Sequence, residues 1–367
     1  MKKIMLTGLI LFCSIYGMLS AQILGKIDYI EGNAELVRDG SSVSVVDIGT
    51  RIENLDQIKT SPDGLVTIAF DRNSGLTGTL QIAPNTVAII RQDQISGTSA
   101  NEVQLMAGSV GLKVKRLAGL KSSVQVRTPT AILGVRGTEF VVASFNGSSL
   151  VACKEGEVSC AAYSGITGAP VGSGGKVSSV PGTLVEVQES GSFTTGIFPD
   201  GDFDKNWNDV QKKWKNFYVD IFIEDPVGFM NNFINNWTKY SNQFLEGSQK
   251  LRSNKVLKNW LRTTKSGKVS GSYSDWVKER PAVMKDMIAL RPNMMMTMIT
   301  WYRLQELIPF IPASSMSKQL SNGQTVRTFV DNFTHVSKNV SDAIEFFNAA
   351  EKQYMLRNDG MSPFSDF

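Results

Sequence analysis

Residues 128–140 read TPTAILGVRGTEF, and this stretch indicates how the first half of the chain folds. Pro129 directs Thr128 toward extended backbone geometry, because the proline ring clashes with a helical residue before it. A short apolar run follows and ends at a glycine, as in a strand that meets a turn. The stretch therefore predicts short extended segments joined by turns.

Gly134 and Gly137 flank Arg136, and glycine tolerates backbone conformations that other residues avoid. This spacing predicts tight turns on both sides of the arginine. We expect the Arg136 guanidinium to satisfy neighbouring carbonyls or a carboxylate such as Glu139 or Asp71, because it carries several donors in a fixed geometry. The interpretation of Arg136 is therefore structural rather than ligand-binding.

The surrounding sequence, from about residue 23 to 198, alternates apolar and polar residues. Residues 66–70 (VTIAF) and 109–114 (SVGLKV) show this period of two clearly. The alternating segments are short and are bounded by Gly, Asn, Asp, Ser and Pro, which is typical of half-buried strands. Residues 22–198 are therefore predicted to form an all-β domain.

A weak repeat within this region places a glycine two residues before an apolar or small residue. Repeated units of a turn and a strand suggest the stacked coils of a β-solenoid or β-roll. The spacing is uneven, so a β-sandwich stays open as an alternative. The repeat occurs at Gly25–Ile27, Gly32–Ala34, Gly108–Val110, Gly156–Val158 and Gly175–Val177.

From about residue 199 the apolar spacing changes to three and four, which predicts an α-helical bundle over residues 199–367. Asp225 and Pro226 are expected to end the first helix and start a second, because proline suits a first helical turn. The packed seam of the first helix is predicted to contain Trp207, Val210, Trp214, Phe217 and Ile221, and a third helix Leu257, Trp260 and Leu261.

The remaining helices are expected to differ in length. Pro281, Pro292, Pro309 and Pro312 predict that the region around them is cut into short helices. Residues 325–356 keep an apolar seam without interruption and are predicted to form the longest helix. The fold class is thus α+β, with a β domain followed by a helical bundle.

Residues 1–21 are typical of a secretory signal peptide, with Lys2 and Lys3 before an apolar core. A lipoprotein leader ending at Cys13 and an uncleaved anchor are the alternatives. The apolar run is shorter than the about twenty residues that span a bilayer. We therefore expect an exported protein, periplasmic, secreted or at the cell surface, with no transmembrane span after leader removal.

Two cysteines outside the leader, Cys153 and Cys160, lie in VACKEGEVSCAAY. An oxidising compartment permits a disulfide between them, and two buried thiols are the equally open alternative. A hairpin turn at residues 156–157 would place Cys153 opposite Cys160, whereas a turn at 155–156 would place it opposite Val158.

The motif at residues 128–140 closely resembles the hallmark of the FecR domain family, and matching flanks extend the resemblance over about residues 25–188. The resemblance implies a β-rich, solenoid-like extracytoplasmic module. In the family's namesakes this module belongs to a membrane-spanning regulator that acts on a sigma factor. This chain departs from that plan in its leader and its helical half, which resembles no family known to us. The motif positions are Thr128, Pro129, Gly134, Arg136, Gly137, Thr138 and Phe140.

The composition argues against most catalytic and cofactor chemistry. The chain has one histidine, three cysteines and a net charge of +4, which offers no concentrated basic face for nucleic acid. His335 is expected to be solvated or at a seam edge, and Ser315–Lys318 fits a Ser-x-x-Lys nucleophile pattern without its companion motifs. We predict no enzyme activity, no metal and no cofactor.

Three further patterns have ordinary structural explanations. Asp200, Asp202 and Asp204 have the spacing of a calcium loop but lack its glycine and glutamate, so helix capping is favoured. The glycines at 172, 174 and 175 indicate a flexible loop rather than a phosphate loop. The methionine-rich residues 293–312 are predicted to be mainly core, with a partner or membrane-surface groove as the alternative.

These features together predict a non-catalytic protein that binds a protein partner or an envelope polymer, as a scaffold or a sensor. The alternative is a periplasmic component of signal transduction that regulates transcription indirectly through a membrane partner. No binding residue, ligand or oligomeric state follows from the sequence.

Overall fold

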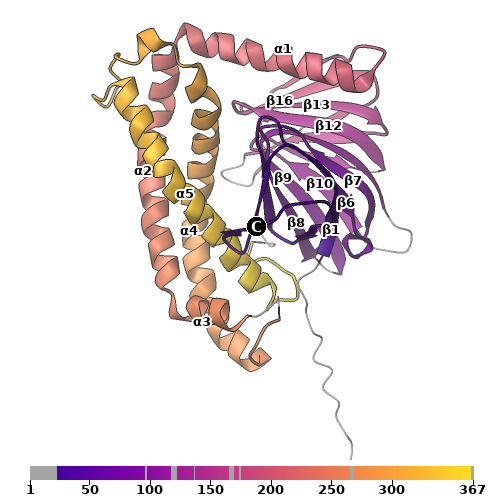
Figure 1. Ribbon diagram of the computed structural model, residues 1–367, viewed down its shortest axis with the longest axis vertical. Coiled ribbons are helices and arrows are strands. Elements are labelled where there is room, and N and C mark those ends of the chain that lie inside the picture. The colour runs from indigo at the N-terminus through magenta and orange to yellow at the C-terminus, as the bar shows by residue number, and fades with distance from the viewer. Residues whose placement is uncertain are drawn as a thin grey trace, which may run out of the picture.

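The computed structural model (Figure 1) describes a β half followed by a helical half, so the predicted α+β combination is confirmed. The predicted signal peptide at residues 1–21, Arg136 and Gly174 lie outside the described residues. The described residues are 23–95, 97–116, 122–135, 137–164, 169–172, 175–264 and 268–364.

The strands of the β half form two sheets that share the long strand β9 (Thr98–Arg116). Sheet A has the order β4 (Arg51–Glu53), β1 (Ile23–Glu31), β6 (Leu65–Phe70), β7 (Leu76–Ile82), β9, β12 (Thr138–Phe145), β13 (Ser148–Glu155), β16 (Thr183–Gln188) and β17 (Phe193–Ile197). Sheet B has the order β3 (Ser41–Ser42), β2 (Ala34–Arg38), β5 (Asp56–Thr60), β8 (Val87–Ile95), β9, β10 (Ser122–Arg127), β11 (Ala131–Val135), β14 (Val158–Ala162) and β15 (Lys176–Ser179).

The chain passes from one sheet to the other after every one or two strands. Neighbouring strands in both sheets are antiparallel, except β9 and β10, which are parallel. The two layers pack face to face, with the alternating apolar residues of both sheets between them. This interior holds Ile27, Leu36, Val66, Leu105, Leu112, Val126, Leu133, Phe140, Val142 and Val185, among others.

Gly108 marks the point where β9 leaves sheet B and enters sheet A. Ala107 pairs with Val87 of β8, whereas Gly108 pairs with Ser144 of β12. The backbone of Gly108 has a φ of +91°, and an added Cβ would lie 2.3 Å from the Thr86 hydroxyl. Only glycine fits this crossing, because it tolerates positive φ and brings no side chain into the contact.

Helices cover the outer faces of both sheets (Figure 1). α1 (Phe203–Glu224) crosses the outer face of sheet A, where Trp207 packs with Leu150 and Ala152. The helices α4 (Tyr273–Leu307) and α5 (Val326–Met355) face the outer side of sheet B, and Met106 and Phe145 of the β half join their core. The other helical elements are η1 (Arg72–Ser74), α2 (Pro226–Ser253), α3 (Lys255–Thr263), η2 (Ile308–Phe310) and η3 (Ala313–Ser315).

The start of the helical half follows the sequence prediction at its caps. The Asp202 side chain accepts a hydrogen bond from the Lys205 amide at 3.0 Å and caps α1, and Asp225 caps α2 in the same way. The predicted change of helix at Asp225 and Pro226 is therefore confirmed. Capping of this kind satisfies amides that have no partner inside the helix.

Two residues of the predicted seam of α1 point to solvent instead. Phe217 and Ile221 are 59% and 49% exposed. The first part of α1 packs on sheet A through Trp207, whereas its last turns bury Val219 and Phe222 in the helical core. Because these two partners lie on different sides of α1, one continuous stripe does not describe its buried surface.

The prediction of short helices around Pro281 and Pro292 is wrong. α4 runs through both prolines for 35 residues and is longer than α5, which has 30. Both prolines lie on the exposed side of α4. The carbonyls that lose a backbone donor can therefore be solvated there, while the opposite side stays packed. None of the described helices combines the length and the apolar composition needed to cross a membrane.

Candidate functional site

A pocket lies between the outer face of sheet B and the helices α4 and α5, and both halves of the chain line it. Its volume is about 70 Å³. The β half contributes Arg91, Arg127, Thr128 and Pro129 to the wall. The helical half contributes Arg291, Met294, Met295, Met298, Glu351 and Phe364. We call this the interdomain pocket.

The Thr-Pro start of the sequence motif forms a tight turn at the wall of this pocket. The Thr128 hydroxyl accepts hydrogen bonds from the amides of Ala131, at 2.9 Å, and Thr130, at 3.2 Å. It also shares a hydrogen bond of 2.7 Å with the hydroxyl of Ser149 in sheet A. The turn is therefore anchored to both sheets, and Pro129 is presented to the helices.

The remaining motif residues belong to the β core or to a turn. Gly137 has a φ of +61° and occupies a turn, as predicted. Gly134 instead lies inside β11, paired with Gln125 and Ser159, so the expected turn before residue 136 does not occur there. Thr138 and Phe140 are buried in β12. The role predicted for Arg136 lies outside the described residues.

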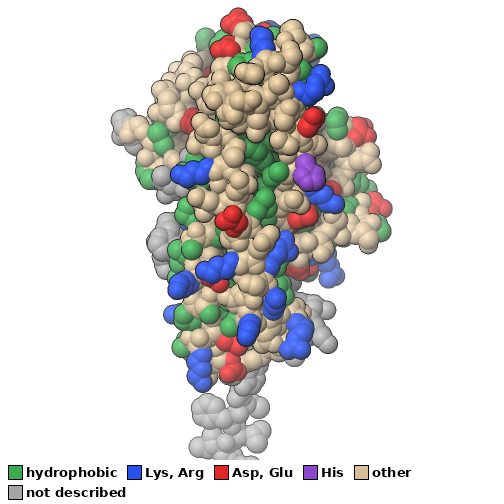
Figure 2. All heavy atoms as spheres, turned by 90° about the vertical axis from the view of Figure 1, so that its left-hand side faces the viewer, with side chains coloured by type: hydrophobic (Ala, Val, Ile, Leu, Met, Phe, Trp, Pro, Cys, Tyr) green, Lys and Arg blue, Asp and Glu red, His purple; other side chains and the backbone are tan. Residues whose placement is uncertain are grey.

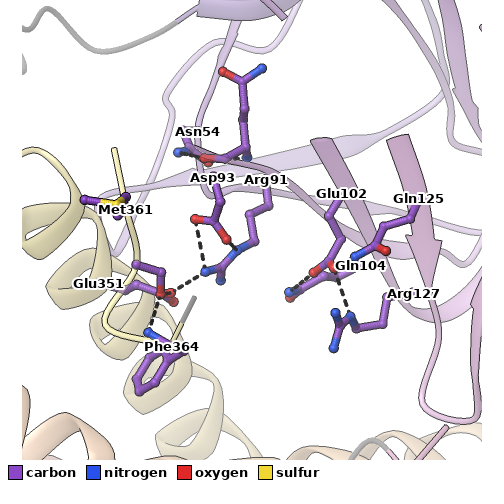
Figure 3. Close-up of polar contacts among 12 residues, drawn as sticks. Asn54, Arg91, Asp93, Glu102, Gln104, Gln125, Arg127, Glu351, Met361 and Phe364 are labelled. Atoms are coloured by element: carbon purple, nitrogen blue, oxygen red, sulfur yellow. Dashed lines mark hydrogen bonds and ion pairs between the residues drawn. The ribbon is translucent and has the colours of Figure 1, made fainter. Parts of the chain in front are cut away.

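Charged and amide side chains form a ladder on the outer face of sheet B (Figure 3). Arg91 of β8 lies opposite Glu102 of β9, and Glu102 lies opposite Gln125 of β10. The Arg127 guanidinium donates to the Glu102 carboxylate at 2.9 Å and to the Tyr163 hydroxyl at 2.8 Å. Burial alone would raise the pKa of Glu102, but the charges of Arg127 and Arg91 and the amide donors lower it.

Arg91 joins this ladder to the helical half. Its guanidinium contacts Asp93 at 3.1 Å within β8 and the Glu351 carboxylate of α5 at 2.7 Å. The Arg91 and Glu351 side chains are only 11% and 4% exposed. Burial of such charges is unfavourable unless they are paired, so the pair holds the two halves in one relative position. Other ion pairs between the halves are Lys59–Glu345, Lys352–Glu53, Lys352–Asp39 and Arg303–Glu189.

A further polar contact between the halves lies at the turn between β12 and β13. The Asn146 amide donates to the Glu306 carboxylate of α4 at 2.9 Å. Gly147 has a φ of +72°, and an added Cβ would lie 1.5 Å from the Arg303 guanidinium. This turn therefore fits closely against α4 because residue 147 has no side chain.

Burial raises the pKa of Glu306 to about 8, although the Asn146 amide and the charges of Lys215 and Arg303 oppose the shift. The folded state thus binds this proton more tightly than the unfolded state. The resulting stabilisation is present at low pH and is lost as the pH rises from about 4.3 toward 8. We expect Glu306→Gln to remove this loss and to raise the Tm by about 4 °C at pH 9, but little at pH 4.

Thermal unfolding at both pH values tests this expectation. Glu189→Gln is the matched control, since Glu189 pairs with Arg303 nearby but is 56% exposed. The control should keep the pH dependence of the wild type. An equal Tm change at both pH values for Glu306→Gln would show that proton binding at this carboxyl does not affect stability.

The two cysteines are free, buried thiols, the second of the predicted alternatives. Cys153 in sheet A lies opposite Phe140, whereas Cys160 in sheet B lies opposite Leu133 and Val177. Both predicted hairpin registers are wrong, because the chain crosses between the sheets at this point. Burial raises the pKa of Cys153 to about 11 and of Cys160 to about 12, so both stay protonated and poorly reactive at neutral pH.

The other candidate residues are dispersed. His335 is exposed on the outer face of the helical half (Figure 2), and Ser315 is buried in η3. Met294 and Met298 belong to the helical core and also line the interdomain pocket, so core and pocket share the methionine-rich segment. Over the described residues, no group of three or more His, Cys, Asp or Glu is arranged to hold a metal ion.

The sequence analysis missed the charged ladder of sheet B. Residues 102–105 (EVQL) and 124–127 (VQVR) alternate polar and apolar side chains, whereas residues 91–94 (RQDQ) are all polar. An alternating strand normally turns its polar face to water, so the pattern gives no sign that helices cover this face. Charge complementarity between Arg91 and a carboxylate far along the chain is the only available signal.

Comparison with known proteins identifies part of the β half. Residues 56–159 match the model of a family described as FecR protein, so the predicted resemblance is confirmed for a segment that includes the motif. No curated protein matches the chain.

Two solved structures also match, both of a "putative anti-sigma factor" from Parabacteroides distasonis ATCC 8503, determined at 1.65 and 2.50 Å resolution. Each is 16% identical over 38% of this chain, with TM-scores of 0.30 and 0.23. The chain covers 59% and 53% of their lengths, little more than half of each.

Proposed function

We propose that this chain is an exported, non-catalytic binding protein of the cell envelope, in which the FecR-type half and the helical half together form a sensor. The observation that carries the proposal is the position of Thr128 and Pro129. These residues belong to the segment that matches the FecR family and also line a pocket shared with α4 and α5. A ligand or partner at that pocket therefore contacts both halves at once.

The chemistry of the pocket favours binding over catalysis. Its wall combines apolar methionines with a few fixed cations, the usual composition of a binding site. The Glu351 carboxylate is held by Arg91 and by the Ser362 hydroxyl. A carboxylate that acts as a general base or nucleophile must be able to reach the substrate. The Glu351 carboxylate is already bonded to Arg91 and Ser362 on the side that faces the pocket, so it is poorly placed for this role.

A role in signal transduction, with transcription regulated through a separate membrane partner, is the second candidate. The match of residues 56–159 to the FecR family supports it. In this form of the proposal the pocket receives the signal, and the relative position of the two halves transmits it. The ion pair between Arg91 and Glu351 is then the contact that responds.

The test combines cell fractionation with photo-crosslinking in the native host. A photoreactive phenylalanine analogue replaces Met361, which is 37% exposed beside the pocket residue Phe364. The control carries the analogue at His335, on the outer face of α5 (Figure 2). We expect the protein outside the cytoplasm and one crosslinked partner that appears from position 361 and not from 335.

Protein found in the cytoplasm, or the same adducts from both positions, would contradict the proposal. Measuring transcripts after deletion of the gene separates its two forms. Signalling would be favoured over scaffolding by two results together. The deletion changes a set of transcripts that the wild-type gene restores, and a pocket variant that prevents the crosslink does not restore them.

A further inference from the structure

The last described residues of the chain fold back into the interdomain pocket. The Phe364 ring is 7% exposed and stacks on Phe347 of α5, with ring centroids 5.8 Å apart. The Ser362 hydroxyl donates to the Glu351 carboxylate at 2.5 Å and accepts a hydrogen bond from the Phe364 amide at 3.1 Å. Residues 358–364, which we call the tail segment, therefore occupy one end of the pocket.

Arg291 of α4 is the cation at this end of the pocket. Its guanidinium lies 4.5 Å from the centroid of the Phe364 ring. Within the described part of the chain, no carboxylate lies within ion-pair distance of Arg291, whereas Arg91 pairs with Asp93 and Glu351, and Arg127 pairs with Glu102. Burial lowers the pKa of Arg291, the charge of Glu351 opposes this shift, and the nearby Arg91 and Arg127 add to it. The site thus holds an aromatic ring beside a guanidinium that makes no direct ion pair with a described residue, although the charge of Glu351 acts on it.

The tail segment is held by few contacts with the β half. The Gln94 amide donates to the Gly360 carbonyl at a long 3.4 Å. Asp359 and Gly360 both have positive φ, of 51° and 79°, a conformation that aspartate adopts less readily than glycine. The pocket also keeps an unfilled volume of about 70 Å³ next to the ring. Exchange of the tail segment would break one long hydrogen bond to the β half, the Ser362–Glu351 hydrogen bond and the contacts of the Phe364 ring, and a partner with similar groups could replace these contacts.

We propose that the interdomain pocket is a receptor site for a partner segment that carries a phenylalanine next to a carboxylate, and that the tail segment occupies this site in its absence. The ring would stack between Phe347 and Arg291, as Phe364 does, and the carboxylate would give Arg291 the ion pair that it lacks. This inference rests on the proposed function, because it names the partner chemistry of the same pocket.

Peptide binding to the purified full chain tests the proposal. The Phe364→Ala variant empties the ring position, and the probe is the peptide NDGMSPF, the sequence of residues 358–364, acetylated and with a free terminal carboxylate. We expect the variant to bind this peptide at least about tenfold more tightly than wild type, in which the tail segment competes. Replacing the peptide's phenylalanine by alanine should abolish binding.

Charge recognition has its own readout. Amidation of the peptide's terminal carboxylate should weaken binding to the Phe364→Ala variant about fivefold, and this difference should vanish when Arg291→Gln is added. Phe364→Leu, which keeps apolar volume without a ring, replaces Phe364→Ala if the latter does not fold.

Equal binding of the phenylalanine and alanine peptides, or no binding to a folded variant, would overturn the receptor-site proposal. These outcomes are distinct from failure of the proposed function. The peptide assay uses purified protein and does not depend on export or on the crosslinked partner, so the crosslink from position 361 could still be found.

Discussion

Arg91→Ala is expected to lower the free energy of unfolding by about 3–5 kcal/mol, one of the largest losses for a single substitution in this chain. The substitution removes the partner of Glu351, whose side chain is 4% exposed and which lies 2.7 Å from the arginine. The buried Glu351 carboxylate would then lose its ion pair and keep the hydrogen bond from the Ser362 hydroxyl. Urea unfolding at neutral pH measures the loss.

Lys113→Ala is the matched control for this loss. Lys113 pairs with Glu139 at the same distance of 2.7 Å, but its side chain is 61% exposed. An exposed pair contributes at most about 1 kcal/mol, because water screens the charges. Arg91→Met combined with Glu351→Leu and Asp93→Asn should recover most of the stability, since neither carboxylate that pairs with Arg91 is then left as an unpaired buried charge. Equal losses for Arg91→Ala and Lys113→Ala would show that burial of the pair is unimportant.

Phe140→Ala is expected to cost about 3–5 kcal/mol, because it removes a large ring from the core between the two sheets. Phe140 is 1% exposed and lies opposite Leu112 on one side and Cys153 on the other. The cavity left in this rigid interior cannot collapse fully, since both neighbouring strands are fixed by their ladders. The measurement is the midpoint of urea unfolding. It is compared with that of wild type, provided that the unfolding free energy depends on urea concentration with the same slope in both proteins.

Phe217→Ala provides the control for aromatic truncation. Phe217 is 59% exposed on α1, so its loss should change stability by about 0.5 kcal/mol or less. A loss at Phe140 no larger than this would mean that the last residue of the FecR-type motif does not serve the core. It would then need another role, and the structural interpretation of the motif would be wrong.

Local sequence patterns predict the elements of this fold well. The period of two in residues 66–70 and the spacing of Trp207 and Trp214 depend on burial of one face, and the structure has a strand and a helix there. The caps at Asp202 and Asp225 are local hydrogen-bonding devices and are equally visible in the sequence. Patterns that one element determines by itself can thus be predicted.

Features set by packing between elements are not visible in the same way. Pro281 and Pro292 indicate breaks in a helix considered alone, yet α4 continues because its opposite side is buried. Cys153 and Cys160 suggest a hairpin, but the choice between a hairpin and a crossing depends on pairing with β12, β11 and β16. Contacts between parts of the chain that are distant in sequence therefore decide both the continuity of α4 and the crossing between the cysteines.

The candidate site is the least predictable part of the chain. Thr128 and Pro129 were singled out by the motif, but nothing in the sequence places them beside Met294 or Phe364. The pocket arises only when sheet B meets α4 and α5, and it is held by an ion pair between residues 260 positions apart. Sequence reasoning therefore found one wall of the pocket and missed the other.

Equilibrium unfolding followed by two intrinsic probes tests most directly whether the halves close around the pocket as one unit. All six tryptophans lie between residues 207 and 301, so their fluorescence reports on the helical half. The buried thiols Cys153 and Cys160 report on the β half through pulsed labelling with a thiol reagent. The interdomain ion pairs predict a single urea midpoint for both probes in the chain from Gln22 onward. Thiol labelling that begins at a clearly different urea concentration from the fluorescence change would contradict this account.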